Sequence, residues 1–307
     1  MTRAVVFAYH NVGVRCLAVL LAHGIEVPLV FSHEDDWREN VWFASVAQFA
    51  RERGIAVLSA PDPNAPECLA RVRACAPDFL FSFYYRRMLG PALLAAAPRG
   101  ALNMHGSLLP KYRGRAPVNW AVVRGERETG ASLHYMTEKP DAGAVIGHQR
   151  VPILPDDSAR EVFDKVTVAA ELLLDRELPG LVAGRAPRKP QVLAEGSYFG
   201  ARRPEDGRID WHRPAAEIHN LVRGVAPPYP GAFCRLGART LKVLRSRVGA
   251  RVAPANATPL LALDERGLYA LCGDGVALRV PECELDGASL GPERFRAEFG
   301  ARTLPLE

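Results

Sequence analysis

The first half of the chain is constrained most by a regular alternation of short apolar runs with helical patterns. Because strands buried on both faces consist of nearly uninterrupted apolar residues, and because strand–helix alternation is typical of parallel sheets, this pattern predicts a doubly wound, mostly parallel α/β sheet. The predicted strands are Ala4–Ala8, Glu26–Phe31, Ala56–Ser59, Asp78–Phe83 and Ala101–His105, and the predicted helices are Val12–Ala22, Val41–Arg53 and Cys68–Cys75.

Further patterns extend this domain beyond residue 130. Ala131–Met136 and Ala144–Ile153 are typical of two more strands, and a long helical pattern runs from about Ser158 to Val182. Glu161 follows Ser158 by three residues, which is the spacing of a capping box at the start of a helix. We therefore expect this helix to begin beside Ser158.

The sequence pattern changes after about residue 200. Several short β-like runs alternate there with turn signals, which indicates a small, barrel-like all-β domain. These runs are Gly231–Leu236, Thr240–Val248, Leu260–Leu263, Leu268–Cys272 and Val276–Val280, and they follow a helical pattern over Ala215–Val225. The irregular stretch Gly184–Pro190 has the composition of a linker. We therefore expect a catalytic domain over residues 1–188 and a second domain over residues 189–307.

Composition and charge exclude several classes of protein. Neither a secretory signal nor an apolar stretch of membrane-spanning length is present, so we expect a cytoplasmic protein without membrane insertion. The net charge of +5 suits an anionic ligand, but no dense basic stripe indicates nucleic-acid binding. No CxxC pair or Cys/His spacing suits a metal, so none is expected, and we predict reduced, mostly buried thiols. The cysteines are Cys16, Cys68, Cys75, Cys234, Cys272 and Cys283.

Two common nucleotide-binding motifs are absent from the sequence. No GxxxxGK[ST] motif is present, which argues against a phosphate-binding loop of the NTPase type. The stretch after the first predicted strand is Tyr9-His10-Asn11-Val12-Gly13-Val14 rather than GxGxxG. A nicotinamide dinucleotide site at that position is therefore not expected.

Polar residues that could carry chemistry are concentrated at the end of the strand that closes at His105. Asn103 and His105 are two residues apart, so on a strand their side chains share one face. Ligands in open α/β sheets bind beyond the carboxyl ends of the strands, where these two side chains would lie. The loop that follows is stiffened by Pro110 and Pro117, whereas Gly114 permits close approach of the backbone. This combination favours a catalytic site over a structural histidine.

Asp141 lies in a loop between two predicted strands. An aspartate in such a loop commonly supports a turn. If the fold brings it beside His105, it would instead stabilise the cationic imidazole. An imidazolium and the amide of Asn103 could then donate to a developing oxyanion, and the Asp–His pair could relay a proton from an amine nucleophile.

The pattern Asn-x-His-x-Ser-Leu-Leu-Pro-x-x-Arg-Gly at residues 103–114, with the later Asp141, resembles the signature of the folate-dependent formyltransferases. Within that family, the chain most resembles the enzymes that formylate UDP-4-amino-4-deoxy-L-arabinose. The opening Val5-Val6-Phe7-Ala8-Tyr9-His10, the segment Phe81–Arg86 and the later Trp211-His212-Arg213-Pro214 carry that similarity as well. The resemblance implies a Rossmann-like transferase domain followed by an OB-like β-barrel domain.

The resemblance also implies a role for individual residues. His105 would donate a proton or stabilise the oxyanion, Asn103 would stabilise the transition state, and Asp141 would keep His105 protonated. The cofactor would be N10-formyltetrahydrofolate, the formyl donor. Its binding residues would come from two loops and one arginine: Arg87, Met88, Leu89, Arg115, Thr137, Glu138, Lys139, Pro140 and Asp141.

The resemblance suggests a UDP-linked 4-amino sugar as the acceptor, with UDP-4-amino-4-deoxy-L-arabinose first among them. Methionyl-tRNA formyltransferase is the alternative, but members of that type carry a basic insertion after the second strand. Residues 32–40 of this chain, Ser-His-Glu-Asp-Asp-Trp-Arg-Glu-Asn, are short and net acidic, which would repel a phosphate backbone. Hydrolysis of the formyl-folate, with water in place of the amine, is a further alternative, and so is a non-catalytic folate- or nucleotide-binding module.

The resemblance carries expectations about partners and biology. The arabinose enzyme is one half of a bifunctional protein, so the dehydrogenase activity is expected on a separate chain. A homo-oligomer is possible within this family. The implied biology is lipid A modification and polymyxin resistance. Arg202, Arg203 and Arg223 are candidate contacts for the phosphates of a nucleotide, with exposure at the surface as the alternative.

Overall fold

The computed structural model describes residues 1–35, 40–300 and 303–306. The chain forms two compact units. The first comprises Met1–Pro117, Glu128–Pro152 and Phe163–Gly200, and the second comprises Val118–Arg127, Ile153–Val162 and Ala201–Glu307. The boundary between residues 188 and 189 stays a prediction.

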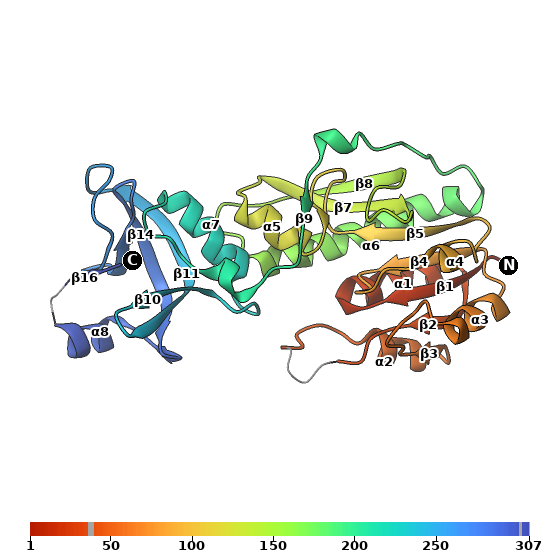
Figure 1. The fold of residues 1–307 in the computed structure, drawn as a ribbon, viewed down its shortest axis with the longest axis horizontal. Coiled ribbons are helices and arrows are strands. Elements are labelled where there is room, and N and C mark those ends of the chain that lie inside the picture. The colour runs from red at the N-terminus through yellow and green to blue at the C-terminus, as the bar shows by residue number, and fades with distance from the viewer. Residues whose placement is uncertain (36–39, 301–302, 307) are drawn as a thin grey trace. The chain divides into compact units, whose positions relative to one another are not determined.

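The first unit is built on a seven-stranded sheet with the order β3-β2-β1-β4-β5-β7-β8 (Figure 1). The strands from β3 to β5 are parallel, whereas β7 runs antiparallel to β5 and β8 antiparallel to β7. The expected mostly parallel sheet is therefore confirmed. The strands are β1 Arg3–Ala8, β2 Glu26–Phe31, β3 Ala56–Leu58, β4 Phe79–Phe83, β5 Gly100–His105, β7 Glu128–Tyr135 and β8 Val145–Pro152.

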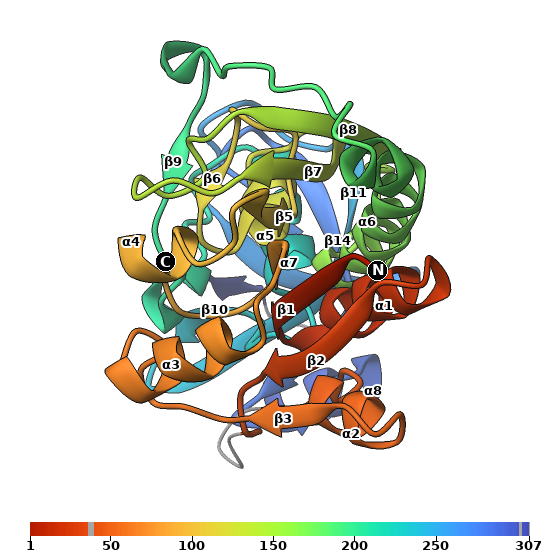
Figure 2. The same cartoon turned by 90° about the vertical axis from the view of Figure 1, so that its right-hand side faces the viewer.

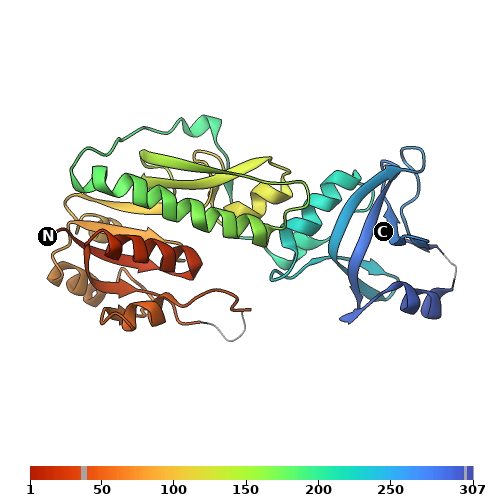
Figure 3. The same ribbon diagram turned by 180° about the vertical axis from the view of Figure 1, so that it is seen from behind.

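Helices cover both faces of this sheet, with α1 and α6 on one face and α3 and α4 on the other (Figure 2). Figure 3 shows the long α6 running beside α1, and the ion pair of Arg15 with Glu171 joins the two helices at 2.5 Å. Because both faces are covered, every residue of β4 is buried. The helices of this part of the chain are α1 His10–Ala22, α2 Val46–Arg51, α3 Pro66–Ala74, α4 Pro91–Leu94, α5 Pro117–Val123 and α6 Ala159–Val182.

One predicted helix is shorter than expected. The pattern over Val41–Arg53 predicted a single helix, but α2 begins only at Val46. The Ser45 side chain accepts a hydrogen bond from the Gln48 N–H and caps the helix there. The preceding aromatic residues pack instead against His10, whose ring centroid lies 4.0 Å from that of Phe43. Packing of these aromatic rings therefore replaces the first helical turn.

The start of α6 follows the sequence prediction. The Ser158 backbone N–H donates to the Glu161 carboxylate at 2.7 Å, and the Glu161 N–H donates to the Ser158 hydroxyl at 3.3 Å. These two bonds form the capping box that the spacing indicated. They satisfy two backbone donors that the first helical turn leaves without intrahelical partners.

The second unit contains an antiparallel half-barrel sheet with the order β10-β11-β14-β13-β12-β16, and β15 pairs with β14. Trp211, Ile218, Val222 and Phe295 lie in its apolar core. The predicted OB-like second domain is therefore confirmed. Its elements are α7 Ala215–Val225, β10 Ala232–Leu236, β11 Arg239–Arg251, β12 Leu260–Asp264, β13 Gly267–Leu271, β14 Val276–Leu285, β15 Ala288–Ser289, α8 Pro292–Phe299 and β16 Leu304–Pro305.

A third, two-stranded sheet was not predicted from the sequence. It pairs β6 Arg113–Gly114 in parallel with β9 Tyr198–Phe199. Neither strand is longer than two residues, so neither produces a recognisable alternation. Two short 3₁₀ helices also escaped prediction, Leu193–Glu195 and Pro204–Gly207.

The six cysteines are free thiols, and five of them are buried, as predicted. Within residues 1–35, 40–300 and 303–306, no helix combines the length and the apolarity that a membrane span requires. The described residues also hold no cluster of three or more His, Cys, Asp or Glu side chains suited to a metal ion.

Candidate active site

The candidate site is built where β5 ends beside β7. Asn103 on β5 lies directly opposite His134 on β7, and His105 lies directly opposite Ser132. Directly opposed residues of an antiparallel pair project from the same face of the sheet. The pairing therefore gathers an amide, two imidazoles and a hydroxyl on one face.

Asp141 enters this group from the loop that joins β7 to β8. Its Oδ1 atom lies 3.4 Å from Asn103 Nδ2, 3.6 Å from His105 Nδ1 and 3.5 Å from His134 Nε2. The backbone of Asp141 is left-handed, with φ of 51°, a conformation that aspartate tolerates better than most residues. Its carbonyl oxygen accepts a hydrogen bond from the Gln191 side chain at 2.9 Å. The fold thus brings the three predicted catalytic residues together at one carboxylate.

Gly114 completes the hold on Asp141. The Gly114 N–H donates to the second carboxylate oxygen, Oδ2, at 2.8 Å. Its φ is 98°, and a Cβ at this position would lie 2.2 Å from the carbonyl oxygen of Phe199. Only glycine fits both the left-handed backbone and the close approach of β9. The glycine of the sequence motif is therefore required by the geometry that orients the carboxylate.

The tautomer of His105 follows from its second ring nitrogen. His105 Nε2 lies 2.7 Å from the carbonyl oxygen of Tyr112. A carbonyl only accepts, so Nε2 carries a proton and Nδ1 is the atom that faces Asp141. The Ser107 hydroxyl donates to the carbonyl of Lys111 at 2.6 Å and helps to hold this loop. A second proton on Nδ1 would give an imidazolium paired with the carboxylate.

The protonation of Asp141 is set by competing effects. Burial alone would raise the pKa of this carboxyl group. The charges of His105 and His134 and the N–H of Gly114 outweigh burial, and they lower the pKa of Asp141 well below its ordinary value. The carboxylate is therefore ionised at neutral pH and favours a cationic neighbour.

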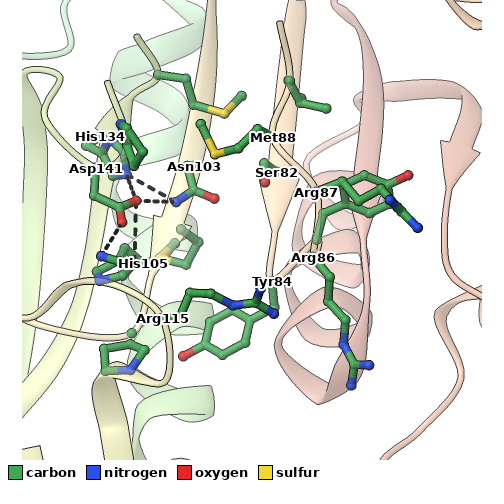
Figure 4. A pocket seen from close by; sticks show the side chains of 18 of the residues that line it. Ser82, Tyr84, Arg86, Arg87, Met88, Asn103, His105, Arg115, His134 and Asp141 are labelled. Carbon is green, nitrogen blue, oxygen red and sulfur yellow. Dashed lines mark hydrogen bonds and ion pairs between the residues drawn. The ribbon is translucent and has the colours of Figure 1, made fainter. Parts of the chain in front are cut away.

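These residues form one wall of a cavity of about 440 Å³. Figure 4 shows Asn103, His105, His134 and Asp141 on one side and Arg86 and Arg87 on the other, with Arg115 extending from its loop toward Tyr84. All of the predicted cofactor-binding residues except two line the cavity. Those that line it are Arg87, Met88, Leu89, Arg115, Thr137, Pro140 and Asp141.

Glu138 and Lys139 are the two predicted residues that do not line the cavity. Both are exposed. The Thr137 hydroxyl donates to the carbonyl of Lys139 at 3.0 Å, which tightens the loop. This turn leaves residues 138 and 139 exposed, and their contact with the cofactor stays a prediction.

The segment after β4 forms the opposite wall. Arg87 and Met88 are exposed, whereas Leu89 is buried against the core. The Asn64 side chain donates to the carbonyl of Met88 at 3.0 Å and accepts from the Gly90 N–H at 2.6 Å. This wall is therefore fixed through its backbone, while its long side chains remain adaptable.

Several residues of the site were not predicted from the sequence. His134 contacts Asn103 and Asp141, Gln191 holds the Asp141 loop, and Ser82 and Tyr198 line the cavity. Only His134 had a usable signal, because it lies on the predicted strand that precedes Asp141. The others depend on strand pairing or on contacts distant in sequence.

The three arginines that were candidates for binding nucleotide phosphates make contacts within the protein. Arg223 is 7% exposed and donates to the Asn220 side chain and to the carbonyls of Leu154 and Asp157. It is therefore a buried structural residue rather than a solvated one. Arg203 donates its backbone N–H to Asp206, and Arg202 stacks over the ring of Trp120.

Fold and site together define a group-transfer enzyme whose centre is an Asn–His–Asp constellation at a strand end. Residues 15–177 match the formyl transferase family, and residues 202–296 match the formyl transferase C-terminal domain. The first match alone spans more than half of the chain, so this protein belongs to the formyl transferase family and is a formyltransferase.

Solved structures share this fold at low sequence identity. The N-formyltransferase from Helicobacter canadensis, in complex with folinic acid and dTDP-3-aminofucose, has a TM-score of 0.72 at 20% identity and covers 91% of this chain and 98% of its own. WlaRD, a sugar 3N-formyl transferase solved with dTDP and 5-N-formyl-THF, has a TM-score of 0.70 at 18% identity, covering 91% and 96%. HypX from Aquifex aeolicus, with tetrahydrofolic acid, has a TM-score of 0.62 at 18% identity, covering 97% and 47%.

Proposed function

We propose that this enzyme transfers the formyl group of N10-formyltetrahydrofolate to the amino group of a nucleotide-linked sugar, with UDP-4-amino-4-deoxy-L-arabinose as the preferred acceptor. The observation that carries the proposal is the convergence of Asn103, His105 and His134 on one oxygen of Asp141 beside a cavity. This arrangement offers proton donors to a carbonyl oxygen and a base to an amine.

The cavity suits a folate-sized group. Its volume of about 440 Å³ is within the range of small-molecule sites. Met88, Leu89, Met104 and Met136 give it apolar lining, which fits a flat ring system, and Arg115 supplies a positive charge at its edge. When bound, N10-formyltetrahydrofolate supplies a formyl carbon that is open to attack by an amine.

The residues of the site have complementary roles in this transfer. As the amine adds to the formyl carbon, negative charge develops on the formyl oxygen. The positive charge of a His105 imidazolium would stabilise it, and the Asn103 NH₂ group would do so when it is turned toward the cavity. The bond from the formyl carbon to N10 then breaks while N10 gains a proton and the amine loses one. The ionised Asp141 carboxylate faces His105 Nδ1, and the pair can pass the proton on.

Two features support a sugar nucleotide as the acceptor. The two most similar structures described above are named for N-formylation, and one of them contains an amino sugar linked to dTDP. The segment after β2, Ser32–Asn40, is short and acidic, which disfavours a tRNA backbone. Residues 36–39 of that segment lie outside the described residues.

The test is an acceptor panel with the purified protein and N10-formyltetrahydrofolate. The acceptors are UDP-4-amino-4-deoxy-L-arabinose, a dTDP-linked 3-amino sugar and methionyl-tRNA, and both tetrahydrofolate release and acceptor mass are followed. We expect one added formyl group on the UDP sugar and none on the tRNA. Formylation of the dTDP sugar alone would correct the nucleotide, and formylation of the tRNA alone would overturn the acceptor class. Folate turnover with free formate would indicate hydrolysis.

A further inference from the structure

His134 is more buried than His105 and Asp141, the other two ionisable side chains at the centre of the site. Its side chain is 2% exposed, against 7% for His105 and 12% for Asp141. Its Nε2 atom lies 3.1 Å from Asn103 Nδ2 and 3.5 Å from Asp141 Oδ1. A buried imidazole in contact with both an amide and a carboxylate of the site can influence how each of them is presented.

One proton on His134 is fixed by the backbone. His134 Nδ1 lies 2.9 Å from the carbonyl oxygen of Tyr135, and a carbonyl only accepts hydrogen bonds. Nδ1 therefore carries a proton in every state that keeps this bond. Only Nε2, the atom that faces Asn103 and Asp141, is left to gain or lose a proton.

The two states of Nε2 favour opposite orientations of the Asn103 amide. Neutral Nε2 is an acceptor, and it receives an N–H of Asn103. Figure 4 shows this orientation, with the amide nitrogen directed to His134 and Asp141 and the amide oxygen directed away from them. Protonated Nε2 is a donor that faces Asp141 Oδ1 at 3.5 Å. It opposes the N–H of Asn103, and a half-turn of the amide would bring the Asn103 oxygen to it as a second acceptor.

The orientation matters for formyl transfer. An oxyanion needs N–H donors, so the Asn103 NH₂ group is useful to it only when it faces the cavity. An attacking amine needs an acceptor for the proton that it loses, and the amide oxygen is suited to hold that N–H. We infer that His134 is a positioning residue that selects, through its own protonation, which end of the Asn103 amide faces the reacting formyl group. The inference rests on the proposed function only for its chemical consequence.

The charged surroundings of His134 are compact. Asp141 approaches from the loop after β7, and His105 lies on the neighbouring strand β5. Arg115 lines the same cavity from the loop that precedes α5. Asp141 brings a negative charge to His134, whereas Arg115 and a protonated His105 bring positive charges. A bound ligand that changes the charge near these groups would change the charge that surrounds His134.

The direct test needs no acceptor. The ring nitrogens of the histidines and the side-chain NH₂ group of Asn103 are followed by ¹⁵N NMR from pH 5 to 9, with Asn103→Ala and His134→Gln identifying the signals. We expect the Asn103 NH₂ signals to shift with the midpoint of His134 Nε2 and to lose that response in His134→Gln. His23→Gln, which removes an imidazole at the C-terminal end of α1 that pairs with Asp175 of α6, should leave this response unchanged. An Asn103 signal that ignores the titration of His134 overturns the inference.

Kinetics test the same coupling by a second route. In His134→Gln we expect kcat to fall about tenfold and one ionisation to leave the pH profile, with KM for formyl-folate within about twofold of wild type. In the Asn103→Ala background the same substitution should cost less than about twofold, because it acts through a group that is already absent. If the fall in kcat of the double variant equals the product of the falls in the two single variants, the inference is overturned. If the NMR coupling is present and no amino sugar is formylated, the proposed function fails while the positioning role stands.

Discussion

The two walls of the cavity are held in different ways. On the β5–β7 wall, side chains bind side chains: Asn103, His105 and His134 meet one oxygen of Asp141, and Gly114 holds the other. On the wall after β4 the backbone is fixed by Asn64, whereas Arg87 and Met88 are exposed. The wall of interlocked side chains therefore suits the reacting groups, which need a fixed geometry, and the wall after β4 suits contacts that adapt to a ligand.

We expect the largest loss of activity from a substitution at the centre of the β5–β7 wall. His105→Ala removes the imidazole that pairs with Asp141, so we expect kcat to fall at least about 10³-fold, within the range for loss of a positioned acid or base. Tetrahydrofolate release under saturating substrates measures it. His212→Ala, at an exposed histidine, serves as control. An activity within tenfold of wild type would contradict the role given to His105.

A smaller effect comes from the backbone that orients the carboxylate. Gly114→Ala places a Cβ against the Phe199 carbonyl in a left-handed backbone, so we expect a loss of about 2 kcal/mol or more in the free energy of unfolding. Chemical denaturation measures the change. Gly24→Ala is the matched control, since φ is 70° there and no atom lies within 4 Å of the added methyl. Gly24→Ala should lower the free energy of unfolding by about 1 kcal/mol. Equal losses at positions 24 and 114 would refute the steric argument.

The charge of Asp141 predicts a pH dependence of stability. Its pKa is lowered in the folded protein, so its stabilisation is fully present above the unfolded value of about 3.9 and is lost as the pH falls toward the folded value. At pH 7 the free energy of unfolding of the wild type should exceed that of Asp141→Asn by about 1–3 kcal/mol. Denaturant titrations at pH 7, 5, 4 and 3 should show this gap closing below about pH 4. A gap that stays constant to pH 3 would show that the charge of Asp141 does not stabilise the fold.

The smallest effect is expected on the adaptable wall. Arg87→Ala should raise KM for N10-formyltetrahydrofolate by about three- to tenfold and leave kcat within about twofold, because an exposed contact is lost without a change in the reacting groups. Initial rates over a range of folate concentrations separate the two constants. Arg51→Ala, at an exposed arginine on α2, is the control. A fall in kcat with unchanged KM would remove the distinction between the two walls.

The seven strands of the large sheet and the helices α1, α3 and α6 could be predicted from the sequence because each relies on local patterning, whereas the short helices α4 and α5 were not predicted. The apolar runs of β1, β2, β4 and β5 and the capping box of α6 are properties of neighbouring residues, and they appear as expected. The start of α2 was wrong because aromatic packing against His10, a tertiary contact, overrides the helical periodicity of residues 41–45. Local patterns carry no information about such contacts.

The predicted and the missed residues of the site also differ in whether they depend on local sequence or on the packed fold. Asn103 and His105 are two residues apart on one strand, so their common face followed from the sequence. His134 reaches Asn103 only through the antiparallel pairing of β5 with β7, and Gln191 reaches Asp141 across 50 residues. Strand register and long-range contacts are set by the packed fold. Without them, the sequence could predict the centre of the site but not its support.

The most direct test of the account follows the formyl carbon itself. The protein is given N10-formyltetrahydrofolate labelled with ¹³C in the formyl group together with UDP-4-amino-4-deoxy-L-arabinose, and ¹³C NMR identifies the product. We expect the label to appear as a formamide on the sugar nucleotide, and we expect His105→Ala, checked to be folded, to abolish this signal. Label found as free formate, or transfer that persists in His105→Ala, would contradict it.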